Sequence, residues 1–126
     1  MSEKFQNVFD EILTLVPTGE FSEIKRRRGG KLRFPIYLDE KLKITEIDAL
    51  ELSIRSSNCL HRAGYMMIAD LVESINGTED LRKIRNCGKK SVDEIMEQLF
   101  CYQYNQLDTS KKIKYIKRVL ELNKAS

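Results

Sequence analysis

The sequence predicts a mainly α-helical fold, a compact helical bundle joined by short loops. Apolar residues recur at spacings of three and four in several segments, and residues that favour helix starts and ends flank those segments. With 41% apolar residues, a protein of 126 residues can bury a core without disulfides. A mass of 14.7 kDa favours one compact domain, or a small domain with ordered extensions, over a multidomain enzyme.

The first forty residues combine a helical pattern with an alternating one. Residues 3–16 place apolar side chains at helical spacing, which predicts an N-terminal amphipathic helix that Pro17 ends. Between residues 21 and 38, a Gly-Gly turn signal is followed by apolar residues that alternate with polar or turn residues. We expect a small β-hairpin here, in which Pro35 limits its strand to a sheet edge or to irregular structure.

Short helices are predicted along the centre of the sequence. Ser53 is a good N-cap for a helix from Ile54 to about Arg62, and Gly64 can close that helix. A second apolar stretch, residues 66–72, ends near an Asn-Gly turn, after which Thr78 can cap a brief third helix.

Two further helices are predicted toward the C-terminus. Residues 92–100 follow helical spacing for nearly three turns, and Asp108 or Thr109 can cap a basic helix that follows. We expect the central core to consist of Ile54, Cys59, Leu60, Ile68, Leu71, Leu81, Ile84, Val92, Ile95 and Leu99.

The composition gives little support to membrane, secreted, metal-binding or catalytic classes. No apolar run approaches the ~18 residues that span a bilayer, and no basic stretch leads into an apolar one at the start, so we expect a cytoplasmic protein. Three cysteines without a CxxC pair favour buried, reduced thiols. A zinc site at Cys59 and His61 would need scattered carboxylates, so core packing is preferred and no cofactor is expected. No catalytic triad or dyad has a supporting motif, and we expect no enzyme.

Positive charge is concentrated in a few places along the sequence. Sixteen of the 22 Lys and Arg residues lie in three windows without acids, residues 25–33, 82–90 and 111–118. Acidic residues gather between residues 39 and 51. Basic clusters of this kind can neutralise phosphates and steer association with nucleic acid, and a solvated surface is the structural alternative for each window.

The loop at residues 85–88 leads directly into the strongest predicted helix. N–H groups at a helix start attract phosphate, and Gly88 lets a DNA backbone come close. The neighbouring lysines add charge without base information. This arrangement is typical of a helix-hairpin-helix motif, and a simple helix-loop-helix corner is the alternative. The GxxxxGK[ST] signature of nucleotide hydrolysis is absent.

Three segments together carry a resemblance to a known family. They are residues 50–60, the short stretch 70–72 and residues 86–91. In this order and at these separations they resemble the C-terminal domain of the bacterial RNA polymerase α subunit, over about residues 35–103. The resemblance implies a compact helical domain with helix-hairpin-helix motifs, which docks on the minor groove of A·T-rich promoter DNA and contacts sigma factors and activators.

The resemblance also implies roles for individual residues. Arg55 enters the minor groove, and Asn58 contacts the nearby sugar-phosphate backbone; a surface pair with Glu51 is the alternative for Arg55. The second motif holds phosphates through Asn86, Gly88, Lys90 and Ser91, and Glu94 beside them helps to orient the basic groups. Such roles agree with the narrow, strongly negative minor groove of A-tracts, which favours an inserted guanidinium.

Several departures from the family pattern bear on function. Glu51 matches an acidic position that meets sigma, but Ala49 stands where an acidic residue is usual. We expect Asp48 and Glu51 to form an exposed acidic patch for a basic protein partner. Cys87 replaces a leucine and His61 replaces a common lysine, which implies DNA binding that is weaker or more sensitive to pH.

The expected organisation has three parts: an N-terminal extension (1–40), a domain that resembles the polymerase family (41–104) and a basic C-terminal helix (105–126). Because the sequence has no room for the large N-terminal domain of α subunits, we expect a free-standing relative. The leading hypothesis is a non-enzymatic DNA-binding protein that acts in transcription. The alternative is a protein-interaction module that mimics the α domain and binds sigma factor, an activator or RNA polymerase.

Overall fold

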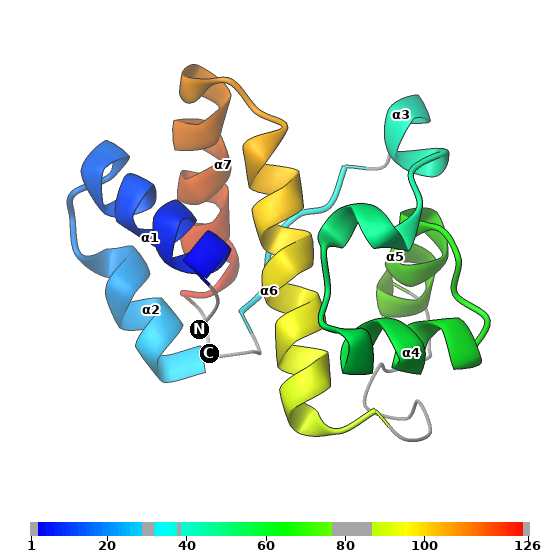
Figure 1. Cartoon of the computed structure of the whole chain (residues 1–126). Coiled ribbons are helices and arrows are strands. Elements are labelled where there is room, and N and C mark those ends of the chain that lie inside the picture. Colours follow the sequence, from blue (N-terminus) through cyan, green and yellow to red (C-terminus); the bar gives the residue numbers. More distant parts are fainter. Residues whose placement is uncertain (1–2, 29–31, 38, 77–86, 125–126) are drawn as a thin grey trace. The chain divides into compact units, whose positions relative to one another are not determined.

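The computed structural model describes residues 3–28, 32–37, 39–76 and 87–124, and their regular structure is helical (Figure 1). The elements are α1 (Glu3–Leu15), α2 (Glu20–Arg28), α3 (Glu40–Lys43), the short 3₁₀ helix η2 (Ile47–Leu50), α4 (Ile54–Arg62), α5 (Ile68–Asn76), α6 (Lys89–Asn105) and α7 (Thr109–Leu122). The mainly helical prediction is confirmed. None of the helices in this part of the protein is long and apolar enough to cross a membrane.

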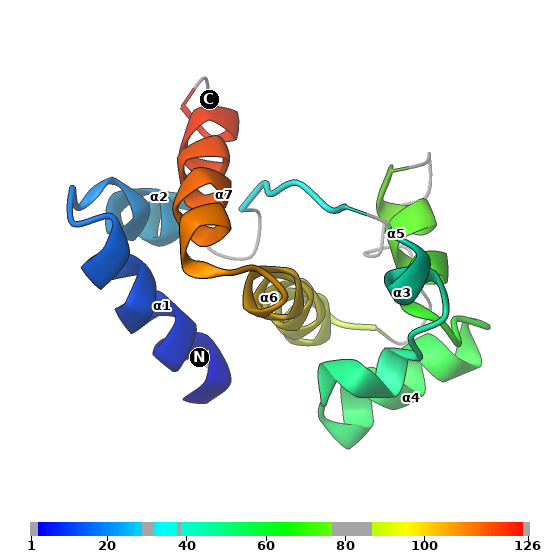
Figure 2. The ribbon, with the colours of Figure 1, turned by 90° about the horizontal axis from the view of Figure 1, so that it is seen from above.

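The protein divides into two compact units. Residues 36–96 form one, here called the central unit, and residues 1–35 together with 97–126 form the other, the terminal unit. Helix α6 contributes its first half to the central unit and its second half to the terminal unit. The extensions expected at the two ends of the sequence therefore belong to one unit, in which α1, α2 and α7 gather (Figure 2).

The terminal unit is built around aromatic side chains. Helix α1 forms where the sequence predicts it and buries its apolar face, including Phe5 and Ile12. The ring of Phe100 on α6 stacks on Phe21 of α2 at 6.0 Å between centroids and meets Phe34 edge-on at 5.4 Å. All five phenylalanines of the sequence lie in this unit.

The prediction of a β-hairpin between residues 21 and 38 is wrong for the residues that the structure describes. Helix α2 occupies residues 20–28, because Phe21 and Ile24 are three residues apart and share one buried helical face. Residues 32–37 have no regular structure, although Leu32 is buried in the terminal unit. The alternating pattern thus reflects an extended segment that covers a helical core.

A buried side chain satisfies the backbone of this extended segment in place of a second strand. Asn123, just after α7, is fully buried and pairs with both backbone groups of Arg33. The Arg33 N–H donates to Asn123 Oδ1 at 3.1 Å, and Asn123 Nδ2 donates to the Arg33 carbonyl at 2.8 Å. The Tyr115 hydroxyl donates to the carbonyl of Pro35 at 2.7 Å. These side chains therefore satisfy the backbone groups of Arg33 and the carbonyl of Pro35, as a partner strand would.

The central unit has an aliphatic core. Helix α4 begins after Ser53, whose hydroxyl accepts a hydrogen bond from the Ser56 N–H at 3.3 Å, and ends before Gly64, whose φ is +89°. Both limits are as predicted. Six predicted core residues are buried in this unit, Cys59, Leu60, Ile68, Leu71, Val92 and Ile95, and Leu99 is buried in the terminal unit. Leu81, Ile84 and the brief helix expected after Thr78 lie outside the described residues.

The prediction that Ile54 belongs to the core is wrong. Its side chain is 81% exposed. The buried face of α4 consists of Ser56, Cys59 and Leu60. At 100° per residue, Ile54 lies on the opposite side of the helix from these three. An apolar residue type is therefore a weaker guide here than helical position.

Candidate nucleic-acid interface

A carboxylate from α6 holds the first turn of α4 in place. The Ser53 N–H donates to Glu94 Oε2 at 3.0 Å, and the Ser53 hydroxyl donates to Glu94 Oε1 at 2.8 Å. The Ser56 hydroxyl donates a short hydrogen bond to the same Oε1. Both motifs singled out in the sequence, one at the start of α4 and one at the start of α6, are joined by this contact within the central unit (Figure 1).

The contact with the two serines affects the pKa of Glu94. Burial of the carboxylate acts to raise its pKa, but hydrogen bonds from Ser56 and from the side chain and backbone of Ser53 together outweigh burial. The pKa of Glu94 is consequently below its usual value, and the carboxylate accepts these bonds in its charged form. The resemblance implies that Glu94 helps to orient the basic groups of the second motif. In the described residues its hydrogen bonds go to the serines of α4 instead, because a pairing across 38 to 41 residues leaves no local signal.

Two cysteines provide a second contact, which joins α4 to the residues just before α6. Cys59 on α4 follows Asn58, and Cys87 precedes Gly88; their side chains are hydrogen-bonded to each other. Burial is the main cause that raises the pKa of Cys87 to about 11, and the interaction with Cys59 is the second cause. The thiol is therefore protonated at neutral pH. Both cysteines are buried and reduced, as expected. The described residues contain no group of three or more His, Cys, Asp or Glu that could hold a metal ion.

The residues expected to contact DNA are distributed around this corner of the central unit. Arg55 and Asn58 on α4 are exposed, as are Gly88 and Lys90 at the start of α6. Ser91, in contrast, is only 6% exposed and counts as buried. Asn86 lies outside the described residues.

The described residues leave space around Gly88. Apart from its chain neighbours, no atom of a described residue lies within 4 Å of a Cβ atom added to this glycine, and its φ is not positive. Neither the backbone conformation nor the packing of the described residues therefore requires glycine at this position.

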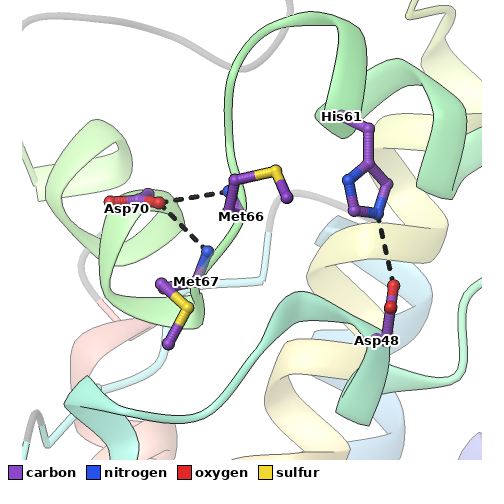
Figure 3. A network of polar contacts seen from close by, with 5 residues as sticks. All are labelled: Asp48, His61, Met66, Met67 and Asp70. Carbon is purple, nitrogen blue, oxygen red and sulfur yellow. Dashed lines mark hydrogen bonds and ion pairs between the residues drawn. The ribbon is translucent and has the colours of Figure 1, made fainter.

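The two acidic residues expected to meet a protein partner lie at η2 and are exposed. Asp48 Oδ1 is 3.2 Å from His61 Nε2 of α4, as Figure 3 shows. Glu51 follows η2 in the left-handed region, with a φ of +54°, and its N–H donates to the carbonyl of Asp48 at 3.1 Å. Figure 3 also shows Asp70 of α5, whose Oδ2 accepts the N–H groups of Met66 and Met67 at 3.1 and 3.0 Å and so caps that helix.

Comparison with known proteins agrees with the motifs at this corner. Three similar proteins are DNA-directed RNA polymerase α subunits. The subunit of Symbiobacterium thermophilum is 46% identical over 66 residues, that of Moorella thermoacetica 43% over 60, and that of Alkaliphilus metalliredigens 46% over 63. These alignments cover 51, 48 and 48% of the present sequence.

The same alignments cover only 20, 18 and 19% of the relatives, so the protein spans about a fifth of their length. No solved structure matches it. Residues 38–100, half of the sequence, match the family described as the C-terminal domain of the alpha chain of bacterial RNA polymerase. The central unit lies almost entirely within that match. The protein therefore belongs to the family of C-terminal domains of the bacterial RNA polymerase α subunit.

Proposed function

We propose that this protein is a non-enzymatic DNA-binding protein of transcription, and that its central unit binds the minor groove of A·T-rich duplex through helix-hairpin-helix-type motifs. The observation that carries the proposal is the contact of Glu94 with Ser53 and Ser56. This contact fixes the helix that bears exposed Arg55 to the helix that begins at the Gly88 loop. Binding groups held by hydrogen bonds in this way lose little freedom when a ligand arrives.

Arg55 is the residue proposed to select A·T-rich sequence. The minor groove offers a degenerate hydrogen-bond pattern, so a single guanidinium reads groove width and negative potential rather than a detailed base code. Asn58, one turn further along α4 and also exposed, is proposed to contact the adjacent sugar-phosphate backbone.

The start of α6 is proposed to hold phosphates without regard to sequence. A helix leaves its first N–H groups without intrahelical partners, and these groups attract anions. Gly88 and exposed Lys90 supply a close approach and a positive charge. Because the Ser91 side chain is buried, we assign its contribution to the backbone N–H rather than the hydroxyl. The phosphate contact of Asn86 is proposed from the sequence motif alone.

The test compares two arginines of the same helix. Arg55 and Arg62 are both exposed on α4, in its first and last turns. Fluorescence anisotropy with A·T-rich and G·C-rich duplexes should show that Arg55→Ala loses about 1 to 3 kcal/mol on the A·T-rich duplex and flattens the preference between the two. Arg62→Ala should keep the preference. Equal A·T preference in wild type and Arg55→Ala would refute the assignment of Arg55.

The alternative function, a protein-interaction module, is favoured by the exposed acidic residues Asp48 and Glu51 at η2. The relatives are subunits of RNA polymerase, which makes polymerase, sigma factor or an activator the proposed partners. This alternative becomes the main function if wild type binds neither duplex but is retained by sigma or polymerase, and if Glu51→Lys abolishes that retention.

A further inference from the structure

The two units carry formal charges of opposite sign. The terminal unit contains thirteen Lys and Arg against eight Asp and Glu, a net charge of +5, whereas the central unit contains nine against eleven, a net charge of −2. The family match reaches only residues 97–100 of the terminal unit. The positive charge is thus concentrated in the part of the protein that the family does not account for.

Helix α7 presents much of this charge on one face. Tyr115, Ile116, Val119 and Leu120 are buried and form the opposite face. Four exposed cations lie within an arc of about 120° on the helical wheel; they are Lys111, Lys114, Lys117 and Arg118. Arg118 pairs with Glu121 at 3.1 Å in an exposed contact, which is the weak kind of ion pair. Neither Lys114 nor Lys117 has an ion pair with a described residue.

Other cations of the terminal unit have structural roles and are distinct from this face. Lys112 donates to Glu11 at 2.8 Å and lies 4.8 Å from the ring centre of Tyr104. Lys25 pairs with Glu97 at 3.1 Å and lies 4.6 Å from the ring centre of Phe5. These two lysines are only 17% and 11% exposed at the side chain, so they hold the unit together.

Helix α2 adds one exposed arginine near the C-terminal end of α7. The two helices pack against each other, and Arg27 Nη2 donates to the backbone carbonyl of Asn123, immediately after α7, at 3.2 Å. Arg27 therefore places an exposed guanidinium at the C-terminal end of α7. We call Lys111, Lys114, Lys117 and Arg118 the α7 face.

We propose that the α7 face is a second DNA-binding surface, which contacts the phosphate backbone of duplex DNA without reading bases. Lys111 to Arg118 spans about 10 Å along the helix axis. A duplex presents one charge per roughly 1.7 Å of its axis, so this length meets on the order of six phosphates. The proposal rests on the proposed function only for its choice of DNA as the polyanion, since the cations and their exposure are independent of Arg55.

The chemistry of the face favours duplex DNA over other polyanions. Surfaces that bind single strands combine positive charge with exposed aromatic rings on which bases stack, and helices that bind membranes pair basic residues with exposed apolar ones. The large apolar residues exposed in the described part of the protein are Tyr37, Ile44, Ile54 and Met66, and none belongs to the terminal unit. A face with charge but no such side chains is suited to a regular array of phosphates.

The experiment uses the full-length protein and two matched double variants. Lys114→Gln/Lys117→Gln removes two exposed charges from α7, and Lys41→Gln/Lys43→Gln removes two exposed charges from α3 in the central unit. Anisotropy titrations on A·T-rich and G·C-rich duplexes at several salt concentrations give affinity and salt slope. Circular dichroism establishes that both variants remain folded.

We expect the α7 variant to bind both duplexes about tenfold more weakly than wild type at 0.1 M salt, with a salt slope smaller by about two units. The α3 variant should keep the wild-type slope. The A·T preference should survive in the α7 variant and be lost in Arg55→Ala, which separates this inference from the proposed function. An unchanged slope in the α7 variant, or an equal loss of affinity and slope in the α3 variant, would overturn the inference.

Discussion

The central and terminal units differ in core, charge and relation to known proteins. The terminal unit packs all five phenylalanines around α6 and carries a net charge of +5. The central unit has no phenylalanine, carries a net charge of −2, and joins its helices partly through polar contacts such as those of Glu94. The family is recognised almost entirely through the central unit.

The two proposals assign different parts of DNA binding to the two units. The unit with the smaller charge has the residues proposed to discriminate among sequences, and the unit with the larger charge has the residues suited to contacts with any duplex. Net charge alone would direct attention to the terminal unit, because long-range attraction depends on it. Specificity depends instead on where a few groups are held, and the groups proposed to supply it here lie in the unit of negative net charge.

Replacing an aromatic residue tests whether the units are energetically separate, and it should give the largest effect. Phe21→Ala removes a fully buried ring that lies 5.6 Å from Phe9 and 6.0 Å from Phe100. We expect a loss of about 3 to 5 kcal/mol in the free energy of unfolding of the terminal unit. Amide hydrogen exchange should speed up in α1, α2 and α7 more than in α4 and α5.

Leu60→Ala is the matched change in the central unit, where Leu60 is also fully buried. Its effect on exchange should be largest in α4 and α5. Equal acceleration in every helix for both variants would mean that the protein unfolds as one cooperative unit, and the comparison would then apply to function but not to stability.

The contact between α4 and α6 should give an intermediate effect. Glu94→Gln removes the charge that accepts hydrogen bonds from Ser53 and Ser56, and we expect it to cost about 1 to 3 kcal/mol of stability. Asp93→Asn, at the preceding position of α6, is the control. Among the described residues, the hydrogen bonds from the start of α4 go to Glu94 and not to Asp93, so this change should alter stability little.

The pH dependence of unfolding gives the same contact a distinct signature. Because the pKa of Glu94 is lowered in the folded state, its stabilising contribution is fully present above about pH 4.5 and is lost as the pH falls through the folded-state value. Urea titrations between pH 6 and pH 3 should therefore show a smaller loss of stability in Glu94→Gln than in wild type. Parallel curves for the two proteins would contradict this role of the carboxylate.

Local rules in the sequence predict part of the fold well. Ser53 and Gly64 set the limits of α4, and Asp108 caps α7 by accepting the Lys111 N–H at 2.9 Å, because capping depends on residues within a few positions of each other. The segment of residues 32–37 has the pattern of a strand, but its backbone is bonded by two side chains, those of Asn123 and Tyr115, which lie 90 and 80 residues away. No periodic pattern encodes such a pairing.

The candidate site was predictable to a similar degree. The resemblance pointed to Arg55, Asn58, Gly88 and Lys90, and all four are exposed. It did not reveal that Glu94 bonds to the serines of α4 or that the Ser91 side chain is buried, because both depend on how α4 packs against α6. The basic window at residues 111–118 was visible in the sequence, but only the structure separates its exposed cations from Lys112, which is held by Glu11.

The most direct test of the central claim, that DNA binds at the corner of α4 and α6, is the affinity of Gly88→Ala for duplex DNA. Apart from its chain neighbours, the added methyl group meets no atom of a described residue within 4 Å, so the protein should stay folded and its thermal unfolding curve should shift by no more than the loss of a glycine cap before α6. At the proposed phosphate contact, the same methyl group should weaken binding to A·T-rich and G·C-rich duplexes alike by about tenfold, the loss of roughly one charge-assisted hydrogen bond. Wild-type affinity for both duplexes in a folded Gly88→Ala protein would contradict the claim.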